Sequence, residues 1–112
     1  MTSLSYIVLY TRDLERLRLF YESLGLTFVR ERHGAGPEHY SATTKEGLVL
    51  ELYPGMSATG RLGFTVKSVK KTMEELARNG FSPIGSDMPS SGKNSLLIRD
   101  PDGRHIELTN AK

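Results

Sequence analysis

The sequence predicts an α+β domain in which a βαβββ module occurs twice in tandem. Two predicted helices of equal span, 13–25 and 68–80, each begin at a capping residue and end at a glycine, and they start 55 residues apart. At nearly the same offset, the segment EGLVLEL (46–52) matches DGRHIEL (102–108). A repeat of both helix and strand patterns indicates a duplicated module.

The first module reads as a strand, a helix and three further strands. The run SYIVLYT (5–11) is apolar, β-branched and aromatic, as a strand requires. Asp13 is typical of a helix N-cap, and Gly25 of a helix end. Between them, apolar residues recur at helical spacing, namely Leu14, Leu17, Phe20, Tyr21 and Leu24. Further strands are expected in LTFVRER, HYSATTK and LVLELY.

The second module repeats this order. Ser68 is the expected N-cap and Gly80 the expected stop of a helix whose apolar stripe is formed by Val69, Met73, Leu76 and Ala77. The segment RDPDGRHIELTN (99–110) predicts a tight turn and a final strand. Each module is too small to bury its helix and sheet alone, so 1–55 and 56–112 are expected to pack together or against a second chain. We expect a single domain of two modules and a homodimer.

Composition excludes several classes of protein. The 112 residues include 15 Lys and Arg against 13 Asp and Glu, and this net charge of +2 is too small for a nucleic-acid-binding footprint. The chain contains no cysteine, which excludes disulfides and thiolate metal sites and favours a reducing cytoplasm. Its N-terminal apolar run is short and lacks a basic leader, so neither a signal peptide nor a membrane span is expected.

Alternation along the strands separates a helix-covered face from a second face. The helix-covered face is expected to hold Ile7, Leu9, Leu50, Leu52, Leu62, Phe64, Val66, Ile106 and Leu108. The second face mixes aromatic rings, small residues and charges, which is typical of a small-molecule pocket. Its candidate ligand-binding residues are Tyr6, Val8, Tyr10, Glu51, Tyr53, Arg61, Thr65 and His105. The alternative is a face left to solvent, as antiparallel sheets often allow.

The three histidines have different expected environments. His105 shares a strand face with Glu107, so it is a candidate proton donor or metal ligand, although a histidine near a turn is more commonly just exposed. His33 and His39 flank the loop HGAGPEH, and six residues is not a recognised spacing for metal ligands. Both are therefore expected to be solvent-exposed loop residues.

The segment DLERLRLFYESLGL (13–26), the terminal DPDGRHIEL (100–108) and the duplicated βαβββ order resemble the vicinal oxygen chelate superfamily. This family includes glyoxalase I, extradiol dioxygenases, and the fosfomycin and bleomycin resistance proteins. The resemblance covers essentially the whole chain and implies a curved mixed sheet around a pocket. It leaves the chemistry open, since isomerases, dioxygenases, transferases and metal-free binders share this scaffold.

The resemblance also implies where a metal ion would bind. Its four ligand positions correspond here to Tyr6, Glu51, Arg61 and Glu107, so both carboxylates are present and both usual histidines are absent. Two carboxylates make a poor transition-metal site, and a guanidinium cannot ligate a cation. We therefore expect no metal cofactor, with Arg61 in its place in a semi-buried network with both carboxylates. The alternative is that Arg61 extends to solvent.

These observations favour a metal-independent small-molecule-binding protein of the glyoxalase/bleomycin resistance type, with an acidic or aromatic ligand held in the sheet pocket. The alternative is a glyoxalase- or lyase-type, or dioxygenase-related, enzyme. It would use Glu51 and Glu107 as residual ligands or bases, with a histidine arriving from elsewhere and Glu107 as the candidate catalytic residue. A third possibility is an interaction module that receives a peptide in a shallow groove.

Overall fold

The computed structural model describes residues 4–56, 61–81 and 95–111. The first module contains β1 (Tyr6–Thr11), α1 (Leu14–Glu22), β2 (Val29–Glu31), β3 (His39–Thr43) and β4 (Val49–Pro54). The second contains β5 (Arg61–Val66), α2 (Val69–Arg78), β6 (Ser95–Arg99) and β7 (His105–Asn110). The strand that a full repeat requires between α2 and β6 falls outside the described residues. Neither α1 nor α2 is long and apolar enough to cross a membrane.

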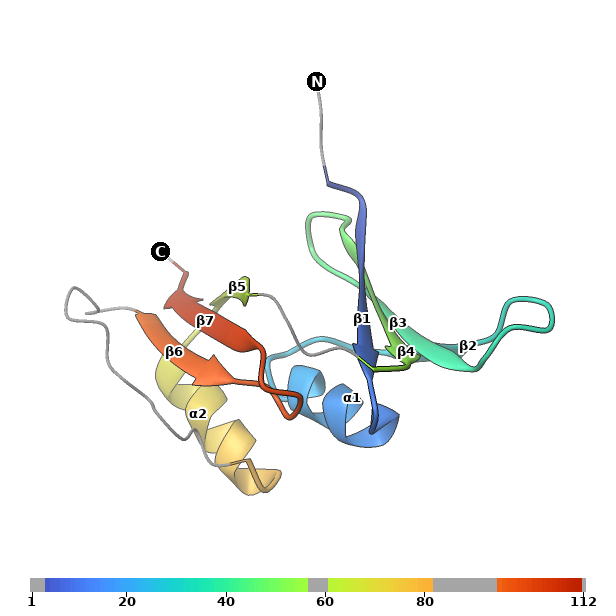
Figure 1. The fold of residues 1–112 in the computed structure, drawn as a ribbon. Helices are drawn as coiled ribbons and strands as arrows, with labels where there is room; N and C mark the ends of the chain where they lie inside the picture. The colour runs from blue at the N-terminus through green and yellow to red at the C-terminus, as the bar shows by residue number, and fades with distance from the viewer. Residues whose placement is uncertain (1–3, 57–60, 82–94, 112) are drawn as a thin grey trace.

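The strands form two mixed sheets, one from each module, which confirms the predicted α+β fold (Figure 1). The strand orders are β1-β4-β3-β2 and β5-β7-β6. In both sheets the first strand of the module runs parallel to the last, and the other pairings are antiparallel. The registers are equivalent, because Val8 lies beside Glu51 in one sheet and Gly63 lies beside Glu107 in the other.

Both helices begin at the predicted caps, and α2 ends just before Gly80 as predicted, whereas α1 ends at Glu22, three residues before Gly25. The Asp13 carboxylate accepts a hydrogen bond from the Arg16 N–H at 3.1 Å, and the Ser68 hydroxyl accepts one from the Lys71 N–H at 3.1 Å. At the end of α2, Gly80 has a φ of +88°, a conformation that glycine adopts without strain. This conformation lets the Phe81 N–H reach back to the Leu76 carbonyl at 2.9 Å and directs the chain into the core.

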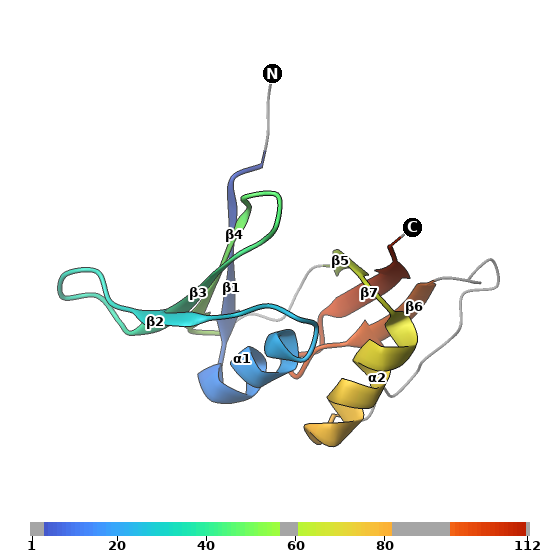
Figure 2. The same cartoon turned by 180° about the vertical axis from the view of Figure 1, so that it is seen from behind.

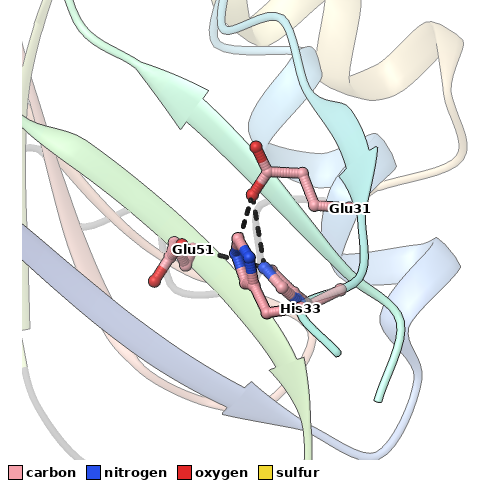
Figure 3. Close-up of side chains that lie close together, drawn as sticks. Glu31, His33 and Glu51 are labelled. Carbon is pink, nitrogen blue, oxygen red and sulfur yellow. Dashed lines mark ion pairs between the residues drawn. The ribbon is translucent and has the colours of Figure 1, made fainter. Parts of the chain in front are cut away.

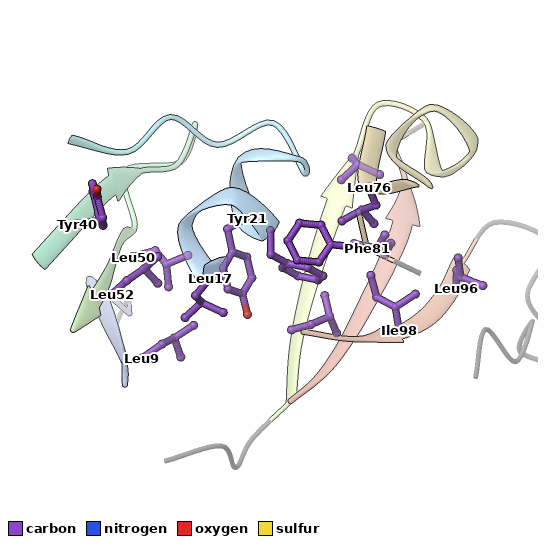
Figure 4. Close-up of a cluster of buried hydrophobic side chains, with 14 residues drawn as sticks. Leu9, Leu17, Tyr21, Tyr40, Leu50, Leu52, Leu76, Phe81, Leu96 and Ile98 are labelled. Carbon is purple, nitrogen blue, oxygen red and sulfur yellow. The ribbon is translucent and has the colours of Figure 1, made fainter. Parts of the chain in front are cut away.

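The buried core joins the two modules through α1, which lies between the sheets (Figures 2 and 4). Phe20 meets Phe81 edge-on at 5.4 Å between ring centroids, and Tyr21 meets Phe64 at 5.7 Å. Every residue assigned to the helix-covered face is buried or partly buried, as alternation predicts. The core therefore depends on both modules at once.

The predicted apolar stripe of α2 is wrong at one residue. Ala77 is exposed, and Thr72 is buried instead. The stripe that contacts the sheet follows the spacing 69, 72, 73 and 76, which is the i, i+3, i+4, i+7 pattern of one helix face. Ala77 lies at the flank of that face.

A buried network of polar groups also connects the modules. The side chains of Asp100 and Arg104 are 0% and 2% exposed and form an ion pair at 2.9 Å. Across the module boundary, the Tyr21 hydroxyl donates to Asp100 at 2.7 Å, and the Arg104 guanidinium donates to the Tyr10 carbonyl. Arg104 also pairs with Asp102 at the turn surface. A buried ion pair is stabilising only when its remaining polar atoms are satisfied. Here the backbone N–H groups of Asp102 and Arg104 donate to Asp100 within the turn, and the two contacts from the first module add to them.

Replacing Asp100 with alanine is expected to lower the free energy of unfolding by about 3–5 kcal/mol, because Arg104 and Tyr21 would stay buried without their acceptor. Urea denaturation measures this loss. Asp102→Ala is the matched control in the same turn, where we expect about 1 kcal/mol or less. Equal losses in the two variants would contradict the role given to Asp100.

Tyr21 predicts a pH dependence of stability. Burial, with the Asp100 carboxylate close by, raises the pKa of the Tyr21 phenol well above its usual value. In the unfolded chain the phenol ionises at about pH 10. The contribution of buried Tyr21 to the free energy of unfolding is therefore complete below that pH and is lost as the pH rises further.

We expect Tyr21→Phe to flatten the fall in unfolding free energy between about pH 9 and about pH 11. Urea denaturation across this range measures the slope, with Tyr6→Phe as the control at a 59% exposed tyrosine. An unchanged slope in Tyr21→Phe would contradict the prediction.

Candidate functional site

The face of the N-terminal sheet that α1 does not cover, here called the open face, brings together the predicted residues of the first module. Strand register places Tyr6 beside Val49, Val8 beside Glu51 and Tyr10 beside Tyr53. A hollow of about 560 Å³ opens on this face, and its lining residues are Ser5, Tyr6, His33, Gly47, Val49, Glu51 and Tyr53. Three of the predicted ligand-binding residues, Tyr6, Glu51 and Tyr53, therefore line one hollow.

The other predicted site residues lie in the C-terminal sheet. Arg61 is beside His105, Gly63 beside Glu107, and Thr65 faces a threonine of β7. These side chains share one strand face, as predicted, but they belong to a sheet whose described strands do not pair with the first. Within one chain the predicted residues thus form two groups.

The predicted three-charge network of Arg61, Glu51 and Glu107 is wrong. Arg61 approaches Glu107 at 3.6 Å, with side chains 61% and 40% exposed, so this pair lies in solvent. Glu51 instead approaches His39 at 3.8 Å. The reason is topological, because Arg61 begins β5 in the second sheet and Glu51 lies in β4 of the first. The alternative, in which Arg61 extends to solvent, fits the structure.

The prediction that both loop histidines are exposed is wrong for His39. Its side chain is 1% exposed and lies on β3, opposite Glu31 of β2. The ring stacks on Tyr53 at 4.1 Å and 10° between ring planes. Alternation along the strand could have indicated this position. His39 lies two residues before Ser41, so both point to the same face, and Ser41 lies opposite Glu51. His33 is 70% exposed, as predicted.

Two histidines and two glutamates converge on the open face (Figure 3). The nitrogen and oxygen atoms that Glu31, His33, His39 and Glu51 offer all lie within 4.8 Å of one another. The Glu31 carboxylate lies 3.6 Å from His33 Nε2 and 3.3 Å from His39 Nε2. We call these four residues the His–Glu cluster. None of them was a member of a predicted site except Glu51.

The orientation of the His39 ring is fixed by its surroundings. Its Nδ1 atom lies 3.2 Å from the Pro37 carbonyl, an acceptor, so Nδ1 carries the hydrogen of this bond. The opposite nitrogen, Nε2, is buried among the described residues without a hydrogen-bond partner and faces Glu31 and Glu51. Buried polar atoms are rarely left in this state.

The carboxylates give the open face a negative character. Partial burial raises the pKa of the Tyr53 phenol, and the nearby charges of Glu51 and Glu31 raise it further. A negative charge on Tyr53 is thus disfavoured. The same field favours a positive charge at this position.

Comparison with known proteins identifies the family. Residues 3–108 match the family described as the Glyoxalase/Bleomycin resistance protein/Dioxygenase superfamily. The chain belongs to this superfamily. The resemblance to vicinal oxygen chelate proteins is thereby confirmed, and it concerns nearly the whole sequence. No curated protein matches the chain.

Several solved structures share the fold at low sequence identity. A hypothetical protein from S. aureus is 18% identical with a TM-score of 0.74, covering 99% of this chain and 98% of its own. A possible glyoxalase from Bacillus cereus is 20% identical with a TM-score of 0.69, covering 97% and 99%. Lactoylglutathione lyase from Agrobacterium tumefaciens is 18% identical with a TM-score of 0.70, covering 99% and 95%. At these identities the likeness concerns the fold alone.

The metal position implied by the superfamily does not fit this chain. Of its four corresponding residues, Arg61 has no lone pair to donate, and it already pairs with Glu107. The remaining carboxylate, Glu51, lies in the other sheet. Tyr6 stands where an imidazole is usual and is 59% exposed. These residues do not make a transition-metal site within one chain.

The exposed Arg61–Glu107 pair predicts a small effect on stability. Glu107→Gln is expected to change the free energy of unfolding by less than about 1 kcal/mol, because solvent screens the charges. Thermal and urea denaturation at low and high salt measure it. A loss of several kcal/mol would show that Glu107 belongs to a buried network after all.

Proposed function

We propose that this protein binds a small organic ligand on the open face of its N-terminal sheet. The observation that carries the proposal is the hollow of about 560 Å³ lined by Tyr6, Tyr53 and Glu51. Aromatic walls with one convergent charge are typical of small-molecule sites, and this volume suits a ligand of drug-like size. Superfamily membership supports this class of function. Arg61 and Glu107 make no ion site here, so we propose that ligand binding is independent of a metal at the superfamily position.

The lining favours an aromatic ligand over an acidic one. Tyr6 and Tyr53 offer ring faces in the hollow, and Tyr10 lies next to Tyr53 at 6.2 Å between ring centroids. An acidic ligand would depend on Arg61, which lies on the other sheet. The carboxylate of Glu51 further disfavours an anion in this hollow.

We also propose that the chain acts as a homodimer in the cytoplasm, with 1–55 and 56–112 as the two modules of a single domain. Exposed apolar side chains that a second copy of the chain could cover support the dimer. They are Leu4, Tyr6, Tyr10, Val29 and Met56. Val8 and Thr65, also predicted to bind ligand, lie on β1 and β5. The cytoplasm follows from the absence of cysteine, with neither membrane nor nucleic acid as a partner.

A second candidate function is an enzyme of the glyoxalase or lyase type. One observation favours it, since His39 reaches Glu51 at 3.8 Å and supplies the histidine that this alternative requires. In this candidate, Glu107 acts as the base and His105 as a proton donor; both lie on β7 in the C-terminal sheet, apart from the His39–Glu51 pair of the N-terminal sheet. Turnover of an α-keto hemithioacetal, lost in Glu107→Gln, would support it.

We expect Tyr6→Ala to weaken binding of aromatic compounds at least about tenfold, because one ring wall of the hollow is lost. The compounds are found by screening an aromatic fragment library against chelator-treated protein, and their Kd is measured by NMR titration. Met56→Ala is the control, since Met56 is 75% exposed and does not line the hollow.

Two results would contradict the proposal. One is a screen in which no fragment shifts the resonances of residues around the hollow. The other is a Kd that Tyr6→Ala and Met56→Ala change equally. A Kd that added zinc lowers in the unaltered chain but not in Glu107→Gln would contradict only the independence from a metal at the superfamily position.

A further inference from the structure

We propose that the His–Glu cluster is a binding site for a divalent transition-metal ion such as zinc or cobalt. Its four residues, Glu31, His33, His39 and Glu51, lie together within the N-terminal sheet and its β2–β3 loop. This position shares only Glu51 with the metal position of the superfamily. The site is therefore built from this chain's own residues.

The donor set points to the class of ion. Two imidazole nitrogens and two carboxylate oxygens are ligands that zinc and cobalt accept in a four-coordinate site. Magnesium and calcium prefer oxygen donors alone, so the two histidines disfavour them. The two carboxylates balance the charge of a divalent cation.

The distances fit ligands arranged around an ion. Bonds of about 2.1 Å in tetrahedral geometry place neighbouring ligand atoms about 3.4 Å apart. The observed separations are 3.3 Å for Glu31–His39, 3.6 Å for Glu31–His33 and 3.8 Å for His39–Glu51. Charge-assisted hydrogen bonds are shorter, about 2.7–2.9 Å, so these three separations are closer to those between ligands of one ion than to those of strong hydrogen bonds.

His39 supplies a second, independent observation. It is 1% exposed, and its Nε2 atom has no hydrogen-bond partner among the described residues. Because the Pro37 carbonyl fixes the hydrogen on Nδ1, a neutral His39 directs a buried lone pair at two carboxylates. An ion bound by Nε2 removes this unfavourable contact. Hydrogen bonding of the opposite ring nitrogen to a carbonyl is the usual support of a metal-binding histidine.

Strand pairing holds three of the donors before an ion binds. Glu31 lies opposite His39 in the β2–β3 register, and Glu51 follows on the neighbouring strand β4. Stacking on Tyr53 restrains the His39 ring. His33 lies in the loop, 70% exposed, and its ring is 4.9 Å from that of His39. The site is thus rigid on its buried side and accessible from solvent through His33.

A protonated His39 between two carboxylates is the competing explanation, and it needs no ion. Metal titration separates a bound ion from a protonated His39, because only the ion requires His33 as a second imidazole ligand. The inference does not rest on the proposed ligand binding, although His33 and Glu51 also line the hollow. The experiment therefore uses metal ions alone, with no organic compound present.

The test is a cobalt(II) titration of the chelator-treated full chain, followed by visible absorption, with zinc binding measured by calorimetry. We expect one ion per chain and the intense absorption of tetrahedral cobalt. His33→Ala and Glu31→Gln, both at exposed or half-exposed positions, are expected to weaken binding at least about tenfold. His105→Ala and Glu107→Gln are the matched controls on the other sheet, where affinity should not change.

NMR of the histidine rings tests His39 without substituting this buried residue. Zinc is expected to shift the Nε2 signals of His33 and His39 and to leave His105 unchanged. Absence of stoichiometric binding, equal losses in His33→Ala and His105→Ala, or a zinc-induced shift at His105 alone would overturn the proposal. Such a failure would leave fragment binding in the hollow intact, so the two proposals can fail separately.

Discussion

The buried pair of Asp100 and Arg104 is the constraint on which the arrangement of the two modules depends. Two charges taken out of water are tolerated only when every remaining donor and acceptor is satisfied. Two N–H groups of the turn bond to Asp100, and Tyr21 of α1 and the Tyr10 carbonyl of β1 supply further partners, so the turn before β7 is tied to the first module. With the modules joined in this way, α1 packs against β4 of the N-terminal sheet and α2 against β7 of the C-terminal sheet (Figures 1 and 2).

The two modules share a frame but differ in chemistry. Glu51 and Glu107 occupy equivalent register positions next to the first strand of their modules. Around Glu51 the neighbouring strands add Glu31 and His39, whereas Glu107 pairs with the exposed Arg61. The two carboxylates thus hold equivalent positions in different surroundings, one in the His–Glu cluster and the other in an exposed ion pair. A fold shared at about 20% identity with a possible glyoxalase is compatible with this divergence.

The sequence predicted most of the fold because its signals are local. Caps at Asp13 and Ser68 and the alternation in β1, β4 and β7 act between residues close in the chain. The candidate site was predicted less well, since it depends on which strands are neighbours. Arg61 was placed with Glu51 because their faces match, and only the topology separates them into different sheets. His39 was placed in the loop because its strand begins at that residue.

The buried network was missed for a related reason. Charged residues in DPDGR are typical of an exposed turn, and nothing local indicates that Tyr21, 79 residues earlier in the chain, covers Asp100. Long-range burial of this kind is decided by packing, which one sequence does not reveal.

The central claim is that the metal-binding capacity of this chain lies in the His–Glu cluster and not at the superfamily position. Anomalous scattering from crystals grown with cobalt tests it most directly, because it locates the ion without relying on a variant. We predict a single strong peak within bonding distance of Glu31, His33, His39 and Glu51. A peak between Tyr6, Arg61 and Glu107, or no peak on the protein at all, would contradict the claim.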